Sequence, residues 1–185
     1  MLSDNQLMLK VKEGNIETLG LLYERYKKRL FGYFYKLNND AQLSEDLVQN
    51  VFVRILKYRK KFTDKGTFSS WIFRIARNVY YDHYRKNKNL NNKTTSLEND
   101  SSKDLAFYEF DTDIDLNDEK ELLQDAFKQL SVDQREVLIL SKYQELPYKE
   151  IADVLGCNEG AVKTKVFRAL KELRIIFFKL HNKTV

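Results

Sequence analysis

The sequence contains few of the residues from which disulfides and metal centres are built. Its 185 residues include one cysteine, Cys157, and two histidines, His83 and His181. A lone thiol cannot form an internal disulfide, and no CxxC or HxxxH pair is present to hold a metal ion. We therefore expect no metal and no cofactor, and we interpret Cys157 as a small residue in a turn.

Long apolar runs are missing as well. No stretch of 18 or more apolar residues occurs, so the sequence predicts no membrane-spanning helix. The polar residues 3–6 (SDNQ) interrupt the N-terminal segment, which does not fit the pattern of a signal peptide. These absences predict a cytoplasmic protein that does not insert into a membrane. Hydrophobic residues still make up 43% of the chain, which is enough for globular cores.

The net charge of +5 is unevenly distributed along the chain. Residues 1–97 carry 19 Lys and Arg against 9 Asp and Glu, residues 98–125 carry 2 against 11, and residues 126–185 carry 11 against 7. Two basic blocks therefore flank an acidic one. Basic blocks favour polyanionic partners such as nucleic acid, whereas the acidic block is expected to avoid DNA.

The acidic block also contains the predicted domain boundary. Residues 87–104 are dense in Asn, Ser, Thr and Asp and show no apolar periodicity, which is typical of a linker. Helical periodicity dominates elsewhere, and no segment alternates like a strand. We therefore predict an all-α protein with two small helical domains, over 1–88 and 118–185, joined by an acidic flexible linker over 89–117.

Three aspartates in this linker, Asp111, Asp113 and Asp115, suggest a calcium-binding loop at first sight. Such a loop needs Gly at its sixth position and Glu at its twelfth. Counted from Asp111, those positions hold Leu116 and Leu122. The sequence therefore does not support a calcium site.

Capping residues predict where several helices begin. Ser3 with Gln6 and Ser131 with Gln134 fit the capping box, in which two side chains and two backbone N–H groups pair reciprocally. Ser44 is predicted to start a further helix. The residues that this helix is expected to turn inward are Leu47, Val48, Val51, Phe52, Ile55 and Leu56.

Residues 146–174 fit a helix-turn-helix. A short helix over Tyr148–Leu155 is followed by Gly156 as a left-handed cap and by Asn158 as the N-cap of a longer helix. The inward residues of the longer helix are predicted to be Val162, Val166, Ala169, Leu170, Leu173 and Phe177. Its outward residues are predicted to be Lys163, Thr164, Phe167, Arg168, Lys171 and Arg174.

This outward face is either a solvated helix surface or a DNA-binding surface. No acidic residue occurs between Ala161 and Lys171, and Phe167 is a large apolar side chain on the side expected to face water. Contact with a thymine methyl or a sugar would explain Phe167, whereas solvation would not. We therefore favour a helix that enters the major groove of DNA.

A helix predicted from about Phe68 to Lys86 carries a second surface. Its apolar face holds Ile72, Ile75, Ala76, Val79 and His83, and we interpret His83 as structural. The opposite face is predicted to hold Phe73, Arg74, Arg77, Asn78, Tyr80, Tyr81, Tyr84 and Arg85. Aromatic rings and guanidinium groups together suit unpaired bases, although some tyrosines of such a stripe can pack against a neighbouring helix or the linker.

These segments together resemble bacterial RNA polymerase sigma factors of the extracytoplasmic-function group. The resemblance lies in DLVQNVFVRILKY (46–58), in FSSWIFRIARNVYYDHYRK (68–86) and in the stretch from Leu130 through the helix-turn-helix. It covers about 19–86 and 122–178, with the motifs in family order and spacing. It implies a protein that is not an enzyme and that directs core RNA polymerase to promoter DNA, with an anti-sigma protein as a further expected partner.

The resemblance also implies roles for individual residues. Residues implied to bind the clamp helices of the polymerase beta-prime subunit are Asp46, Gln49, Asn50 and Arg54. Those implied to melt and read the minus-ten element are Trp71, Arg74, Arg77, Asn78, Tyr81 and Arg85. Those implied to read the minus-thirty-five element are Lys163, Thr164, Lys165, Phe167, Arg168 and Lys171. The C-terminal domain is further implied to contact the beta flap.

Two positions depart from the family pattern, and two other functions stay open. Asn50 stands where an acidic residue is common, and Pro147 stands where Ser or Thr often caps the first helix of the motif. The same helix-turn-helix would also suit a regulator that binds its operator without polymerase. A nuclease using Asp111, Asp113 and Asp115 is disfavoured, because these carboxylates lie in the linker without convergent basic or histidine partners.

Overall fold

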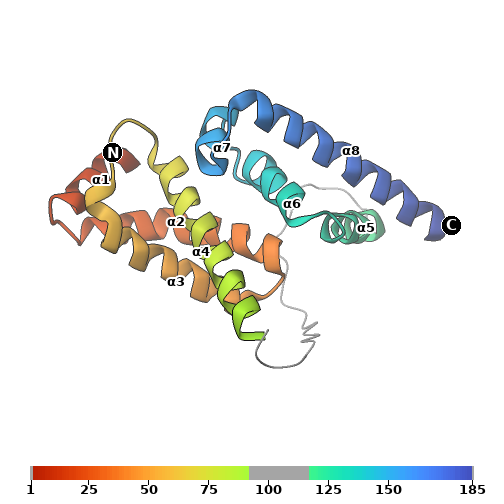
Figure 1. The fold of residues 1–185 in the computed structure, drawn as a ribbon, viewed down its shortest axis with the longest axis horizontal. Coiled ribbons are helices and arrows are strands. Elements are labelled where there is room, and N and C mark those ends of the chain that lie inside the picture. Colours follow the sequence, from red (N-terminus) through yellow and green to blue (C-terminus); the bar gives the residue numbers. More distant parts are fainter. Residues whose placement is uncertain (1, 92–116, 185) are drawn as a thin grey trace. The chain divides into compact units, whose positions relative to one another are not determined.

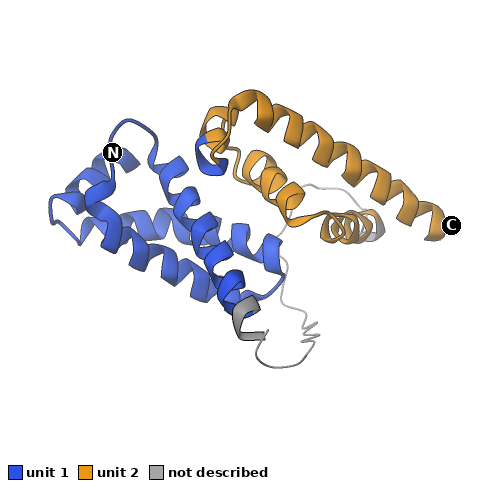
Figure 2. Ribbon diagram, in the orientation of Figure 1, with its two compact units in different colours: residues 1–106, 153–155 blue, residues 107–152, 156–185 orange. Residues whose placement is uncertain are grey.

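The computed structural model describes residues 2–91 and 117–184, and over these residues every regular element is a helix (Figure 1). The chain divides into two compact units, coloured separately in Figure 2. One unit groups residues 1–106 and 153–155, and the other groups 107–152 and 156–185. We name them the N-terminal unit and the C-terminal unit. The predicted all-α fold class is therefore confirmed, while the predicted linker lies largely outside the described residues.

Over residues 2–91, the N-terminal unit contains four α-helices and a short 3-10 turn. They are α1 (Asp4–Lys12), α2 (Thr18–Asn38), α3 (Ala41–Tyr58), the 3-10 turn Arg59–Lys61, and α4 (Phe68–Asn91). Helix α2 packs against α1 and α3, and α4 packs mainly against α3, with further contacts to α1 and α2. Side chains from all four helices meet in one core.

Helix ends in this unit follow local hydrogen bonding, with one correction. The predicted capping box of Ser3 and Gln6 is present. Helix α3, however, begins at Ala41, because the Asp40 carboxylate accepts a hydrogen bond from the Leu43 N–H at 3.0 Å. Ser44 lies buried in the first turn, where its hydroxyl donates to the Asp40 carbonyl at 2.6 Å. The prediction that Ser44 starts this helix was wrong.

Helix α4 is buried over a wider arc than its sequence indicated. Its predicted inward residues are buried except His83, which is half-buried with its Nε2 2.9 Å from the Asn87 amide nitrogen. Phe73 and Tyr80, predicted to face outward, are also buried, and Phe73 is 0% exposed. The Phe73 ring packs edge-on against Tyr33 of α2, with ring centroids 5.6 Å apart. Because α4 contacts both α2 and α3, more than one of its sides is covered.

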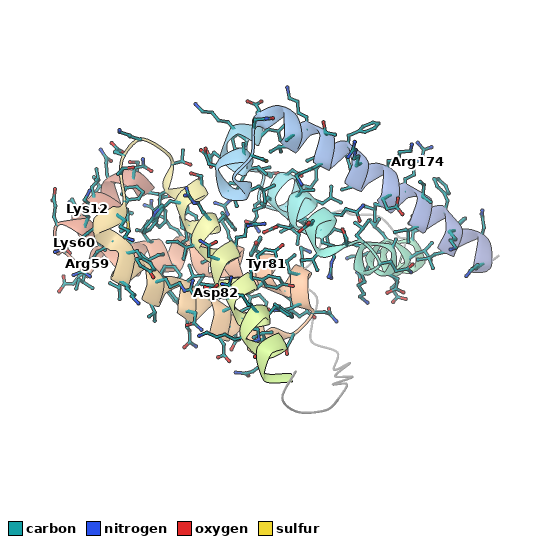
Figure 3. The ribbon with its side chains drawn as sticks, viewed as in Figure 1. Lys12, Arg59, Lys60, Tyr81, Asp82 and Arg174 are labelled. Carbon is teal, nitrogen blue, oxygen red and sulfur yellow. The ribbon has the colours of Figure 1, made fainter. Side chains whose placement is uncertain are left out.

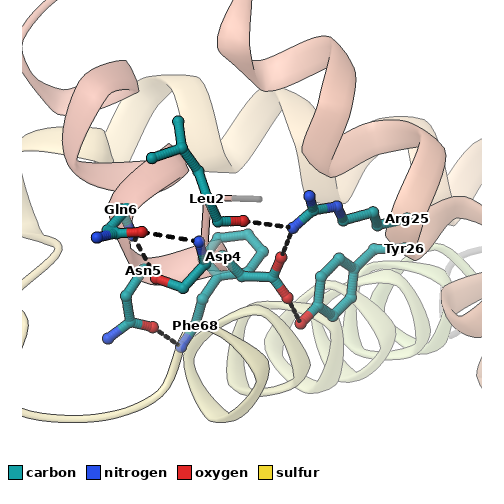
Figure 4. A network of polar contacts seen from close by, with 8 residues as sticks. Leu2, Asp4, Asn5, Gln6, Arg25, Tyr26 and Phe68 are labelled. Atoms are coloured by element: carbon teal, nitrogen blue, oxygen red, sulfur yellow. Dashed lines mark hydrogen bonds and ion pairs between the residues drawn. The ribbon is translucent and has the colours of Figure 1, made fainter.

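Helix α1 fastens the loop that leads into α4 (Figure 4). The Asn5 amide nitrogen donates to the Asp64 carboxylate at 2.6 Å and to the Gly66 carbonyl at 2.8 Å. Its oxygen accepts from the Phe68 N–H at 2.7 Å, so a residue of α1 caps α4. Lys12 adds a hydrogen bond to the Phe62 carbonyl at 2.7 Å. The start of α4 therefore depends on contacts made about sixty residues away in sequence.

The C-terminal unit is built around its last helix. Its elements are α5 (Asn117–Lys128), α6 (Val132–Leu138), the π-helical turn Ile139–Tyr143, α7 (Tyr148–Leu155), whose last three residues are grouped with the other unit, and α8 (Glu159–Thr184). Both α5 and α6 pack against α8. The predicted capping box of Ser131 and Gln134 is present, and the π turn follows α6 directly. None of the helices in the described part of the chain is long and apolar enough to cross a membrane.

Replacing Asn5 tests whether α1 holds the start of α4. We expect Asn5→Ala to lower the free energy of unfolding of the protein by about 1–2 kcal/mol, because three polar groups lose their partner. Asn5→Asp keeps an acceptor for the Phe68 N–H but loses both donors and places a second carboxylate beside Asp64. Asn5→Asp should therefore lower the free energy of unfolding by at least as much as Asn5→Ala. Urea unfolding followed by circular dichroism measures the stability of both variants. If Asn5→Asp were as stable as the wild type, Asn5 would not hold the start of α4.

Candidate nucleic-acid interface

The helix-turn-helix forms as predicted. Helix α7 ends at Gly156, whose φ of 67° is the left-handed conformation that glycine adopts without steric cost. The Asn158 side-chain oxygen accepts from the Ala161 N–H at 2.8 Å and caps α8. Cys157 lies between these two caps in a turn and is half-buried. The turn joining the two helices is therefore three residues long.

Helix α8 turns an acid-free surface to solvent. Its buried side holds Val162, Val166 and Ala169, as predicted. All six residues predicted to read duplex DNA are exposed: Lys163, Thr164, Lys165, Phe167, Arg168 and Lys171. Phe167 is 68% exposed. A large apolar side chain is seldom so exposed on a helix surface that only contacts water. The Thr164 hydroxyl donates to the Gly160 carbonyl at 3.1 Å and keeps its oxygen as an acceptor.

Leu170 differs from its predicted position. It was expected in the core, but it is exposed. At about 100° per residue Leu170 lies at the edge of the buried arc and next to Phe167. The neighbouring helices cover only the centre of that arc, so residues 163–171 of α8 expose two large apolar side chains, Phe167 and Leu170, rather than Phe167 alone.

Helix α4 presents the second predicted surface in a narrower form. With Phe73 and Tyr80 in the core, the remaining residues of the predicted outward face share an arc of about 120° at 100° per residue. They are Arg74, Arg77, Asn78, Tyr81, Tyr84 and Arg85. The residues implied to read the minus-ten element differ in exposure. Arg74, Asn78 and Arg85 are exposed, while Trp71, Arg77 and Tyr81 are half-buried. The Arg77 guanidinium lies over the Tyr81 ring, 4.7 Å from its centroid.

Trp71 is held against the core of the same unit. Its ring packs edge-on against Phe62, with centroids 5.2 Å apart, and lies 6.0 Å from the Phe68 ring. The hydrogen bonds of Lys12 to Phe62 and of Asn5 to Phe68 fix the backbone on which both rings are carried. Trp71 is therefore placed by α1 and the loop as well as by α4.

The predicted polymerase-binding residues of α3 divide into two groups. Asp46, Gln49 and Asn50 are exposed on one face. Arg54 is half-buried, and its Nη2 pairs with the Asp82 Oδ2 of α4 at 2.7 Å. Sequence reasoning missed Val53, which is 62% exposed and follows Gln49 and Asn50 by four and three residues on the same face. Its apolar character at an outward position was the available signal.

Basic side chains gather where α1 meets the 3-10 turn. Figure 3 labels Lys12, Arg59 and Lys60 at this end of the N-terminal unit, and α1 contacts the turn. Charge counting showed that this part of the chain is basic but did not show which residues meet. The three residues add positive charge near the loop that precedes α4, as a nucleic-acid surface requires.

Asp82 is the only acid of α4, and it lies next to Tyr81 in Figure 3. Its carboxylate pairs with Arg54 and also with Arg85, one turn further along α4. The hydrogen bond from Arg54 lowers the pKa of Asp82 below its usual value, and the charges of Arg54 and Arg85 act in the same direction, against the effect of burial. The carboxylate is thus ionised when it holds the two guanidinium groups.

Some sequence predictions fall outside the described residues. They are residues 92–116 of the predicted linker, which include Asp111, Asp113 and Asp115. The prediction that the linker begins at 89 was wrong, because α4 continues to Asn91. Within the described residues, no group of three or more His, Cys, Asp and Glu side chains is arranged to hold a metal ion.

Family models match both units. Residues 22–90 match the model described as sigma-70 region 2, and residues 120–173 match the one described as sigma-70, region 4. These two matches contain α3, α6 and α7 entirely, α4 except its last residue, and most of α8.

Whole-chain relatives agree with these matches. The ECF RNA polymerase sigma factor SigX of Bacillus subtilis is 31% identical over 172 residues, which cover 85% of this chain and 82% of SigX. The ECF RNA polymerase sigma factor BldN of Streptomyces coelicolor is 31% identical over 169 residues, covering 91% of this chain and 63% of BldN.

Solved structures share the fold. The sigma factor RpoE of Bartonella quintana, solved in complex with the anti-sigma factor NepR, superposes with a TM-score of 0.68 at 25% identity, over 85% of this chain and 95% of that one. CnrH, solved with the cytosolic domain of CnrY, superposes with a TM-score of 0.70 at 22% identity, over 95% and 97% of the two chains.

The pKa of Asp82 provides a test of the Arg54 pair. We expect its carboxyl to titrate below the ordinary value of about 3.9, and Arg54→Ala to raise its pKa toward that value. Because the folded-state pKa is lowered, the pair stabilises the fold above the unfolded value and loses this effect as pH falls through the lowered one. Carbon-13 NMR of the side-chain carboxyl measures the midpoint. An ordinary midpoint in the wild type would show that the pair does not form in solution.

Proposed function

The chain belongs to the RNA polymerase sigma factors of the extracytoplasmic-function group, and from this premise we propose how its two units share promoter binding. As a sigma factor it is a non-enzymatic initiation factor that binds core polymerase and directs it to promoter DNA. In our proposal, residues 1–88 dock on polymerase and hold the minus-ten element, and residues 118–185 bind the minus-thirty-five element. Residues 89–117 join them. We place this activity in the cytoplasm, where core polymerase works.

We propose that α8 reads the upstream element in the major groove. The observation that carries this proposal is the exposed, acid-free surface of Lys163, Phe167 and Arg168 on a helix whose start is capped by Asn158. Lysine and arginine neutralise phosphates, and arginine also donates two hydrogen bonds to a guanine edge. Phe167 supplies an apolar contact for a thymine methyl or a sugar. Lys165, Thr164 and Lys171 border the same surface.

We propose that α4 holds the displaced strand of the minus-ten element. Arg74, Asn78 and Arg85 are exposed beside the half-buried rings of Trp71 and Tyr81. Stacking of a base on such a ring contributes about 1–3 kcal/mol, which offsets part of the cost of unstacking the base from the duplex. The Asn78 amide can donate to and accept from a base edge. Arg77 stacks on Tyr81 and stiffens this surface.

Docking on polymerase is assigned to the exposed face of α3. Asp46, Gln49 and Asn50 supply polar contacts for the clamp helices of the beta-prime subunit, and Val53 supplies an apolar centre among them. Apolar anchors surrounded by polar residues are the usual composition of a protein interface. Asn50 removes one negative charge from this face relative to the common family pattern, and its amide hydrogen-bonds to the Asp46 carbonyl at 3.2 Å. The C-terminal unit is assigned to the beta flap.

An anti-sigma protein is the further partner in this proposal. RpoE of Bartonella quintana was solved with such a partner, and that relative shares both fold and sequence with this chain. Helix α8 also exposes apolar side chains beyond its DNA-reading part, namely Ile175 and Phe178. An apolar surface of this kind suits a protein partner better than solvent.

Binding to core polymerase tests the central assignment. We expect the protein with core polymerase to start transcription at its promoter, and we expect Val53→Asp to weaken core binding tenfold or more, since a charge replaces an apolar anchor (about 1.4 kcal/mol or above). Leu21→Asp, at an exposed leucine of α2, is the matched control and should bind normally. Fluorescence anisotropy measures both affinities. A protein that shifts promoter DNA alone but ignores core polymerase would instead be a free-standing regulator.

The division of labour between the units is tested with two DNA probes bound by the holoenzyme. Arg168→Ala should weaken binding to an upstream duplex by about fivefold to a hundredfold, the range for one bidentate base contact, and spare a single-stranded minus-ten oligonucleotide. Asn78→Ala and Arg74→Ala should show the opposite pattern. Equal losses on both probes for either kind of variant would refute the division.

A further inference from the structure

Asp82 lies between residues of two proposed surfaces. Its Oδ2 pairs with Arg54 of α3, which the family resemblance groups with the polymerase-binding residues, and its Oδ1 pairs with Arg85 of α4, which belongs to the minus-ten surface. A single carboxylate therefore holds one guanidinium from each set. Each oxygen serves one arginine, so neither pair displaces the other.

The Arg54 pair is more enclosed than an ordinary surface ion pair. The side chains of Arg54 and Asp82 are 30% and 27% exposed, and they lie where α3 packs on α4. The neighbouring docking residues Asp46, Gln49 and Asn50 are exposed. To reach a polymerase side chain, the Arg54 guanidinium would have to leave a 2.7 Å contact and leave the Asp82 carboxylate partly buried without it.

The charge pattern of α4 also calls for an explanation. Arg74, Arg77 and Arg85 lie on a helix with no acid besides Asp82. If only phosphate attraction mattered, an acid beside Arg85 would weaken DNA binding. A carboxylate there is useful when it restricts the rotamers of Arg85, whose side chain is 74% exposed.

We propose that Asp82 is a positioning residue for strand capture and that Arg54 acts through Asp82 rather than by touching polymerase. Arg54 anchors the carboxylate on α3, and the anchored carboxylate orients Arg85 toward the displaced strand. The proposal rests on the minus-ten role of α4 given above. It moves Arg54 from the docking surface to the support of the DNA surface.

The experiment is a double-mutant cycle on the full-length protein bound to core polymerase. Arg54→Ala, Asp82→Asn and the double variant are measured for core affinity and for binding of a single-stranded minus-ten oligonucleotide. We expect each single variant to weaken strand binding about fivefold. The double variant should bind the strand as tightly as either single variant, because both changes break the same chain of contacts. Core affinity should stay within about twofold of wild type. Circular dichroism confirms that each variant is folded.

A salt series adds a measurement that a merely structural role would not change. Loss of one phosphate contact lowers the slope of log affinity against log salt by about 0.7 for a single strand. Asp82→Asn and Arg85→Ala should both show this decrease in slope. The double variant should have the same slope as Arg85→Ala alone. The Gln42→Ala variant, at an exposed position of α3 away from this chain of contacts, is the control.

Three results would overturn the proposal. If Arg54→Ala lowers core affinity while Asp82→Asn does not, Arg54 contacts polymerase. If Asp82→Asn strengthens strand binding, Asp82 acts through repulsion alone. If Asp82→Asn leaves both strand affinity and salt slope unchanged, the pair has no role in capture. A wild-type holoenzyme that fails to bind the oligonucleotide would instead contradict the assignment of α4 itself.

Discussion

Helix α4 must satisfy two opposing requirements, and much of the N-terminal unit follows from them. It packs against α3 and contacts α1 and α2, which buries Phe73 and Tyr80 as well as the predicted apolar face. In the role that we propose for it, α4 must also keep an arc with Arg74 and Asn78 open to nucleic acid. A helix covered on more than one side has only a narrow arc left for function. That arc is rigid because the rest of the helix is packed.

The two units place the helices that we propose bind DNA, α4 and α8, by similar means. In each unit, a long helix buries part of its surface, exposes a side poor in acids, and begins at a turn stabilised by an asparagine side chain. In the C-terminal unit that residue is local, since Asn158 caps α8 from the preceding turn. In the N-terminal unit it is remote, since Asn5 of α1 caps α4. Preorganised helix ends reduce the conformational entropy that is lost when DNA binds.

Asp82 and Asn5 support α4 from opposite ends. Asn5 and Lys12 fix the loop and the first turn, where Phe68 and Trp71 lie. Asp82 and Arg54 join the later part of α4 to α3. The surface that we assign to the displaced strand lies between these two sets of contacts. Val53 and its polar neighbours on α3 therefore belong to the same packed body as that surface, so docking on polymerase and strand capture are supported by one rigid core.

The sequence by itself determined the helical class, the helix-turn-helix, both capping boxes and the acid-free face of α8, because all of these depend on residues within one or two turns of each other. The tertiary structure decided what depends on neighbouring helices. A helical wheel places Phe73 and Tyr80 on the outward side of α4, because it assumes that only one side of a helix is covered. Both are buried, since α4 is covered on more than one side. The pairing of Arg54 with Asp82, the capping of α4 by Asn5 and the exposure of Leu170 and Val53 depend on which helices approach and how far they extend, and local periodicity contains no information about that approach.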